Sequence, residues 1–152
     1  QSLYICSERP GGQGGEDIWV ARKSGGAWQT PVNLGGVVNS SGNELPRWIS
    51  DDGRTLLFNS DRPGGQGSVD MWYTVYEGDA WQAPVNLGPA VNSAAIELGA
   101  SFKCNHGAMG GFIFFGSGRE GGHGGWDLWQ STDDEYHAVE PASFGRVKAV
   151  FE

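Results

Sequence analysis

The chain has 152 residues, enough for one ordinary domain, and a formal net charge of −8 from 18 acidic and 10 basic side chains. This acidic balance repels phosphate backbones and anionic lipid, so we expect neither nucleic acid nor a membrane surface as a partner. No apolar run approaches the roughly 20 residues of a spanning helix, and membrane insertion is therefore not expected.

The N-terminal segment QSLYICSERP lacks the basic start and the long apolar stretch of a signal peptide, and its pattern is that of a β-strand. Two cysteines, Cys6 and Cys104, permit one disulfide but are too few for a disulfide scaffold. We interpret them as two buried thiols.

A long motif occurs three times along the chain. It reads SERPGGQGGEDIW from Ser7, SDRPGGQGSVDMW from Ser60 and SGREGGHGGWDLW from Ser117, with spacings of 53 and 57 residues. A second motif, WQTPVNLG from Trp28 and WQAPVNLG from Trp81, repeats with the same offset of 53. Two polar pairs keep that offset as well: Asn39 with Asn92, and Glu44 with Glu97. The chain is therefore built from internal repeats of about fifty residues.

Each repeat divides into four short runs rich in β-branched and aromatic residues, without a helical period. In the second copy these runs are 44–50, 55–60, 70–76 and 80–87. The separators Asp52-Gly53 and Gly78-Asp79 are typical of two-residue hairpin turns. The runs TLLF and FIFF are apolar on both faces, which predicts sheets covered on both sides by neighbouring sheets. We therefore predict an all-β fold, a β-propeller with blades of four antiparallel strands.

We predict a single domain of about three blades over residues 1–152. Blade one covers 3–35 and lacks its innermost strand, blade two covers 44–88, and blade three covers 97–140. Propellers have about four to eight blades, so three cannot close a ring alone. We expect half of a six-bladed ring, completed in a homodimer, or else a piece of a longer propeller.

The residues after blade three follow no repeat landmark. The segment EYHAVE is a candidate for a makeshift outer strand of that blade. The tail 141–152 contains GRVKAVFE, which we predict as an inner strand for a first blade, exchanged between two copies.

The pattern ELxxxISDDGRTLLFxSDRPGG…DMW resembles the TolB-type, WD40-like propeller repeat, over about residues 3–131. Copies with RPGGxGGxD followed by PVNLG look most like those beside OmpA-type peptidoglycan-binding domains of bacterial envelope proteins. Asp51 stands where the family has proline. The resemblance implies a six-bladed ring and a periplasmic or secreted location.

In such blades, the loop between the second and third strands and the linker to the next blade share one end, where we expect any ligand. Three arginines in these loops are candidate ligand-binding residues, and each precedes an aspartate by eight positions: Arg9 and Asp17, Arg62 and Asp70, Arg119 and Asp127. We predict that each Arg pairs with its Asp, which also accepts loop N–H groups. The alternative is a ring of arginines facing an anionic ligand.

Gln13, Gln66 and His123 occupy the same position at the loop tips and are candidates for a shared partner surface; the alternative is that they are solvated side chains without a binding role. The histidines 106, 123 and 137 lack metal-ligand spacing, and the glycine-rich loops lack the helix and the Lys-Ser/Thr of a phosphate loop. We therefore expect neither a metal nor a cofactor.

Glu44 and Glu97 begin inner strands, and we predict that they accept hydrogen bonds from neighbouring loop backbone. The alternative is a carboxylate pair for general acid–base chemistry in an axial channel. The recurring tryptophans are expected in the core between blades: Trp19, Trp72 and Trp129, and Trp28 with Trp81. Trp48 and Trp126 do not recur. We expect each to fill the core, and the alternative is an exposed stacking platform for sugar.

No nucleophile motif is present, and we expect no enzyme. The sequence favours a non-enzymatic binding module that recruits a protein or peptide on its loop-rich face. The alternative is a carbohydrate-binding propeller, or a remnant glycosidase, that uses Trp48, Trp126, Glu44 and Glu97. A third hypothesis is a purely architectural role in a larger ring.

Overall fold

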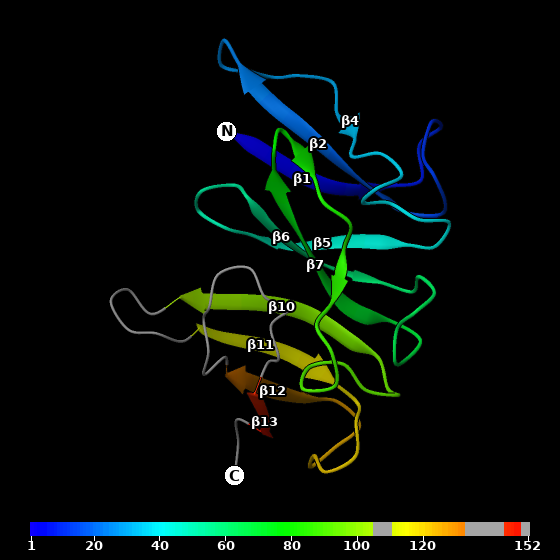
Figure 1. The fold of residues 1–152 in the computed structure, drawn as a ribbon, viewed down its shortest axis with the longest axis vertical. Coiled ribbons are helices and arrows are strands. Elements are labelled where there is room, and N and C mark those ends of the chain that lie inside the picture. The colour runs from blue at the N-terminus through cyan, green and yellow to red at the C-terminus, as the bar shows by residue number, and fades with distance from the viewer. Residues whose placement is uncertain (105–110, 133–144, 150–152) are drawn as a thin grey trace.

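The computed structural model describes residues 1–104, 111–132 and 145–149, and these form strands and loops only (Figure 1). The predicted all-β class is confirmed for this part of the chain. The strands make three antiparallel sheets that follow one another in chain order, and the described residues form no closed barrel. No helix able to cross a membrane occurs among them. The arrangement of the sheets as blades of a propeller stays a prediction.

The strands have the following bounds. The first sheet contains β1 (Ser2–Ser7), β2 (Asp17–Ser24), β3 (Ala27–Trp28) and β4 (Val32–Asn33). The second sheet contains β5 (Glu44–Ile49), β6 (Thr55–Ser60), β7 (Asp70–Glu77), β8 (Ala80–Trp81) and β9 (Val85–Asn86). The third sheet contains β10 (Glu97–Cys104), β11 (Gly111–Ser117), β12 (Asp127–Thr132) and β13 (Gly145–Ala149).

The outer strand of the second sheet differs from the single run predicted over 80–87. It consists of two short pieces, β8 and β9, and both pair with β7. Pro84 lies between them and has no N–H to donate to a ladder, which explains the interruption. The first sheet repeats this break at Pro31, between β3 and β4.

The hairpin turns agree in part with the prediction. Gly78 and Asp79 form the two-residue connection between β7 and β8, with φ angles of 57° and 63°. The turn around Asp52-Gly53 is longer than predicted, because residues 50–54 all lie between β5 and β6. Ser50 stabilises this turn: its hydroxyl oxygen accepts from the N–H of Thr55 at 2.9 Å, and its carbonyl accepts from Gly53 at 2.8 Å.

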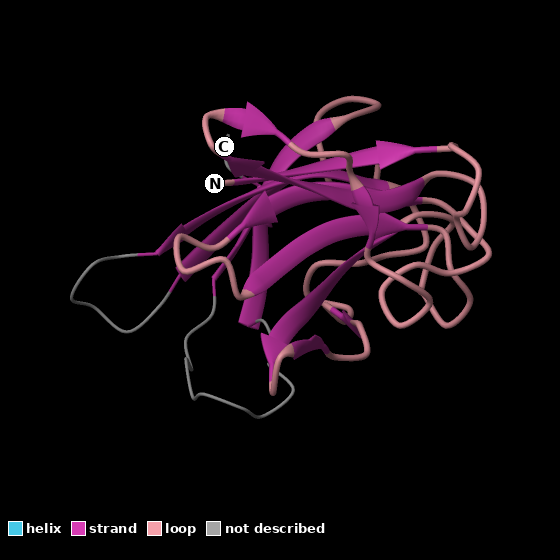
Figure 2. Ribbon diagram, turned by 90° about the horizontal axis from the view of Figure 1, so that it is seen from above, coloured by secondary structure: helices cyan, strands magenta, loops and turns pink. Residues whose placement is uncertain are grey.

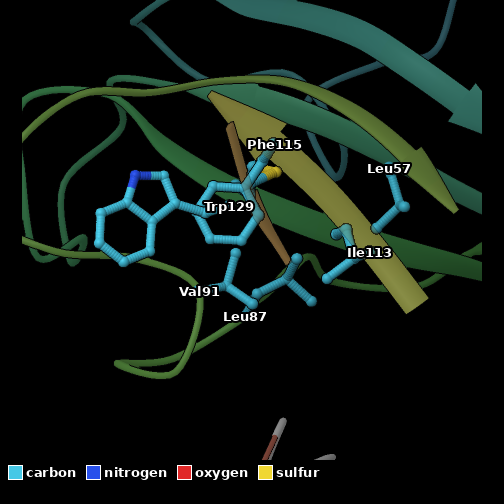
Figure 3. Close-up of a cluster of buried hydrophobic side chains, with 7 residues drawn as sticks. Leu57, Leu87, Val91, Ile113, Phe115 and Trp129 are labelled. Carbon is cyan, nitrogen blue, oxygen red and sulfur yellow. The ribbon is translucent and has the colours of Figure 1, made fainter. Parts of the chain in front are cut away.

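Strand β6 is buried on both faces, as the apolar run TLLF predicted. Leu56 and Phe58 pack with Ile18, Val38 and Trp72 in a first interface, between the first and second sheets. On the opposite face, Leu57 belongs to a second interface, between the second and third sheets. The second interface is drawn in Figure 3 and also contains Met71, Leu87, Val91, Ile113, Phe115 and Trp129.

The two interfaces are built from equivalent positions of the repeat. Ile18 and Val38 correspond to Met71 and Val91 at an offset of 53 residues. The positions that correspond at an offset of 57 are Leu56 and Ile113, Phe58 and Phe115, and Trp72 and Trp129. One packing solution therefore serves both junctions between sheets.

Two predictions about buried side chains near the first sheet are wrong. Trp28 is 48% exposed, whereas its counterpart Trp81 packs against the first interface and meets the ring of Tyr4 edge-on at 6.3 Å. Tyr4 belongs to the preceding sheet, and Trp28 has no preceding sheet among the described residues to cover it. Cys6, predicted as a buried thiol, is an exposed free cysteine on β1. The side chain of Cys104 lies outside the described residues.

The tail segment adopts a role within this chain that differs from the predicted one. Gly145–Ala149 forms β13 and pairs antiparallel with β12 as the outermost strand of the third sheet (Figure 1). The segment EYHAVE, predicted as that outer strand, lies outside the described residues. The exchange of tails between two copies stays a prediction.

Truncation of an aromatic side chain in an interface should lower the free energy of unfolding more than truncation of an exposed apolar side chain. Phe115 is 1% exposed, and we expect Phe115→Ala to lower the free energy of unfolding by about 3–5 kcal/mol. Val32 is 60% exposed, and Val32→Ala should change the free energy of unfolding by less than about 0.5 kcal/mol. Urea titration of both variants checks this, and equal effects would contradict the assigned packing.

Candidate functional site

The glycine-rich loops and the linkers between sheets, which can be identified in Figure 1, gather at one end of the molecule (Figure 2). The loops follow β1, β6 and β11, which end at Ser7, Ser60 and Ser117. The linkers 34–43 and 87–96 lead into β5 and β10 from the same end. We call this end the loop-rich face.

An aspartate at the start of the third strand of each repeat holds the loop tip in place, as predicted. The carboxylate of Asp17 accepts the N–H groups of Gln13 and Gly14. The carboxylate of Asp70 accepts those of Gln66 and Gly67 in the same way. Asp127 accepts from the N–H of Gly124 at 3.2 Å, so all three loops use one anchor.

Two asparagines connect this anchor to the linker. Asn33 donates to the Asp17 carboxylate at 2.9 Å, and its own oxygen accepts from Asn39 at 2.9 Å. Asn39 is buried and also exchanges two hydrogen bonds with the backbone of Ile18. In the second repeat, Asn86, Asn92, Asp70 and Met71 make the equivalent bonds.

The predicted pairing of Arg62 with Asp70 is wrong. The guanidinium of Arg62 instead pairs with Glu44, with Nη2 3.1 Å from Oε1, and donates to the carbonyl of Val38 in the linker. The Cζ atom of Arg62 lies 5.0 Å from the ring centroid of Phe58 and 5.3 Å from that of Trp72. Burial lowers the pKa of Arg62, and the nearby carboxylate offsets part of that effect.

The third sheet repeats this arrangement in full, so the pairing predicted for Arg119 with Asp127 is also wrong. Arg119 Nη2 lies 3.0 Å from Glu97 Oε1 and donates to the carbonyl of Val91. Its guanidinium covers the rings of Phe115 and Trp129. Both arginines therefore join an inner strand, a linker and an aromatic core, and their charge is neutralised internally.

Glu44 and Glu97 accept hydrogen bonds from the linker backbone, as predicted. Glu44 receives the N–H and the hydroxyl of Ser40 at 2.9 and 2.5 Å, and the hydroxyl of Ser60 at 2.8 Å. Glu97 receives the same three donors from Ser93 and Ser117. Both glutamates have an exposed fraction of 0%. Neither carboxylate is open to a substrate in this conformation.

The linker between the first and second sheets has an additional anchor. Asp61 accepts the N–H of Asn43 at 2.6 Å and its side-chain amide at 2.7 Å. Partial burial raises the pKa of Asp61, but the two hydrogen bonds from Asn43 together lower it by more. The pKa of Asp61 is therefore below its usual range.

The first sheet contains only half of the arginine arrangement. Arg9 lies over the ring of Trp19 at 5.1 Å, and its Nε donates to Ser7 Oγ at 3.1 Å. Among the described residues it has no carboxylate partner, so its predicted pairing with Asp17 is wrong as well.

The predicted tip residues Gln13, Gln66 and His123 are all exposed. Of the two tryptophans that do not recur, Trp126 is 55% exposed beside the third loop, whereas Trp48 packs against the second interface. Among the described residues, no group of three His, Cys, Asp or Glu side chains is arranged to hold a metal ion.

Sequence reasoning missed the pairing of arginine with glutamate, although the repeat contained a signal for it. Glu44 and Glu97 occur only in the copies that have an inner strand, and each precedes the Arg of its own copy. The equal spacing of Arg and Asp in all three copies pointed to the wrong acid.

No protein-family model matches the chain, and no curated protein matches it. The resemblance to TolB-type repeats therefore depends on the repeat motifs alone.

Loss of the buried ion pair should destabilise the second sheet far more than loss of the unpaired arginine destabilises the first. Arg62→Met leaves the Glu44 carboxylate buried without its cation, and we expect a loss of about 3–5 kcal/mol in the free energy of unfolding. Arg9→Met removes mainly a cation–π contact, worth about 1 kcal/mol. Chemical denaturation measures both, and addition of Glu44→Gln to Arg62→Met should recover part of the loss.

Equivalent glycines at the loop tips should differ in their tolerance of a side chain. A Cβ on Gly67 would lie 2.1 Å from the carbonyl oxygen of Ala95 in the following linker, whereas one on Gly124 would meet nothing within 4 Å. We expect Gly67→Ala to lower the thermal midpoint by several degrees and Gly124→Ala to leave it nearly unchanged. Similar midpoints for the two variants would contradict the contact between loop and linker.

Proposed function

We propose that the protein is a non-enzymatic binding module of the TolB-type, WD40-like propeller kind, and that its loop-rich face recruits a protein or peptide. The envelope location, periplasmic or secreted, is part of this proposal and is supported by the family resemblance of the repeats. The observation that carries the proposal is the repetition of exposed tip side chains, Gln13, Gln66 and His123, on loops held by the same aspartate anchor.

The chemistry of the tips supports a partner with hydrogen-bonding groups. Amide and imidazole side chains each both donate and accept, and they suit peptide groups and polar side chains. Rigid backbone anchors beneath each tip lower the entropy lost on binding. Equivalent tips on successive sheets extend the contact surface beyond what one loop offers.

The charges around the tips make a cationic or neutral polar partner the better match. Glu8, Asp61 and Glu120 are exposed on the same three loops, and these loops contain no lysine. The positive charge of Arg62 and Arg119 is neutralised by buried glutamates, so only Arg9 is left to offset these three carboxylates. An anionic partner would therefore meet uncompensated carboxylates.

One observation favours carbohydrate as the alternative ligand. Trp126 is 55% exposed beside the third loop, and an exposed indole face is suited to stacking on a sugar ring. The acid–base part of that alternative has less support, because Glu44 and Glu97 are buried and fully engaged.

The tip residues can be tested by selecting peptides on the wild-type protein from a displayed library and measuring their affinity for variants. The combined variant Gln13→Ala, Gln66→Ala, His123→Ala should weaken the selected peptides at least about tenfold, with an unchanged thermal midpoint. The matched control is Asp51→Ala, Arg54→Ala, Glu77→Ala, which changes exposed residues at the opposite end. Equal affinity for both variants would refute the assigned face. Glycan binding that is lost in Trp126→Ala would favour the alternative.

A further inference from the structure

In both the second and the third sheet, a serine hydroxyl and an arginine guanidinium donate to the carboxylate of a glutamate of the same sheet. In the second sheet, the hydroxyl of Ser60 and Nη2 of Arg62 lie 2.8 and 3.1 Å from Oε1 of Glu44. In the third sheet, the same two donor types lie 2.9 and 3.0 Å from Oε1 of Glu97. Each glutamate begins an inner strand that pairs antiparallel with the strand ending in the serine.

The first sheet contains the two donors without the acceptor. Ser7 and Arg9 stand 53 residues before Ser60 and Arg62. Nε of Arg9 donates to Ser7 Oγ at 3.1 Å, as Nε of Arg62 does to Ser60 Oγ at 3.2 Å. The Arg9 guanidinium is also held over a tryptophan, as in the other two copies. A preformed pair of donors is therefore directed toward the position that a carboxylate fills elsewhere in this chain.

The strand edge beside these donors is also unpaired. β6 and β11 pair with a strand on each side, whereas β1 pairs only with β2 among the described residues. A free strand edge is a template for an added strand.

We propose that the edge of β1 binds an extended polypeptide segment that adds to the first sheet as an antiparallel strand and places a glutamate carboxylate on Ser7 Oγ and Arg9 Nη2. Backbone hydrogen bonds along the edge supply affinity, and the carboxylate fixes the register. The segment has the chemistry of the chain's own inner strands, which begin Glu44-Leu45 and Glu97-Leu98.

The segment is none of the strands that the structure describes. Both Glu-Leu strands of this chain already pair within their own sheets, β5 with β6 and β10 with β11. A second copy could offer its tail strand, Gly145–Ala149, but that strand does not begin with a glutamate. Dependence on a carboxylate therefore separates this proposal from tail exchange. The proposal is also independent of the function of the loop tips.

The register of the added strand follows from the second sheet. There, Glu44 lies opposite Ser60 and Leu45 lies opposite Asn59. Asn59 corresponds to Cys6 in the first repeat. The glutamate of the bound segment should therefore face Ser7, and its leucine should face Cys6.

The first experiment titrates the peptide NELPRWIS, the sequence of residues 43–50, into the full chain by fluorescence anisotropy or calorimetry. We expect binding that weakens about tenfold or more when the peptide glutamate is changed to glutamine (Glu44→Gln), the cost of one charge-assisted hydrogen bond. The protein variant Arg9→Gln should weaken the parent peptide by a similar factor and make the two peptides nearly equal. Arg22→Gln changes an exposed arginine of β2, in the same sheet, and should have no effect.

Each other outcome of this titration contradicts the proposal. No binding at about 1 mM peptide would refute the open edge as a site. Equal binding of the glutamate and glutamine peptides to the wild-type chain would refute the carboxylate position. Ser7→Ala is the second variant if Arg9→Gln does not fold, and it should also weaken the parent peptide more than the glutamine peptide.

A disulfide trap tests the register. In a Cys104→Ser background, Cys6 is the only thiol of the chain. A peptide with Leu45→Cys should cross-link to Cys6, and one with Pro46→Cys should not, since a shift of one residue turns the side chain to the other face. Equal cross-linking of both peptides would refute the register. A stable dimer in sedimentation equilibrium that excludes the peptide would show that a second copy occupies the edge and would overturn the proposal.

Discussion

A buried glutamate that pairs with an arginine at each junction between sheets is the interaction on which the rest of this structure depends. Glu44 and Glu97 each neutralise one guanidinium and accept hydrogen bonds from the linker that enters their strand. Such a carboxylate is costly to bury unless every lone pair is satisfied, and here serine hydroxyls and a backbone N–H complete the set. The pair thereby fixes the inner strand, the linker and the loop in one position relative to the next sheet.

The arginine connects this polar centre to the apolar packing. Arg62 and Arg119 lie between a carboxylate and two aromatic rings, so the same side chain closes the core and the hydrogen-bonded loop region. Equivalent apolar residues fill both interfaces, and the same polar contacts recur above them. The loops of the loop-rich face are alike for a related reason. Each loop tip is held by an aspartate at the first position of the strand that follows the loop.

Much of the fold could be predicted from local patterns. The run TLLF is apolar on both faces, and β6 is indeed covered on both sides; Gly78-Asp79 has turn chemistry, and both residues have positive φ. The anchoring role of Asp17 and Asp70 also followed from their place after a glycine-rich loop. The partner of Arg62 could not be predicted in this way, because spacing along the chain does not say which of two acids lies on the same side of the strand. Trp28 was predicted incorrectly for a related reason: its burial depends on a neighbouring sheet and not on its own motif.

The sequence by itself determined the strand content, the period of the repeat and the residues that form the turns, because these depend on side-chain alternation and backbone preferences within a few residues. The tertiary structure alone decided which carboxylate pairs with each arginine, which tryptophan is covered, and that Gly145–Ala149 pairs with β12. These outcomes depend on contacts between segments far apart in the chain. Burial and charge compensation then select among partners that local sequence leaves equivalent.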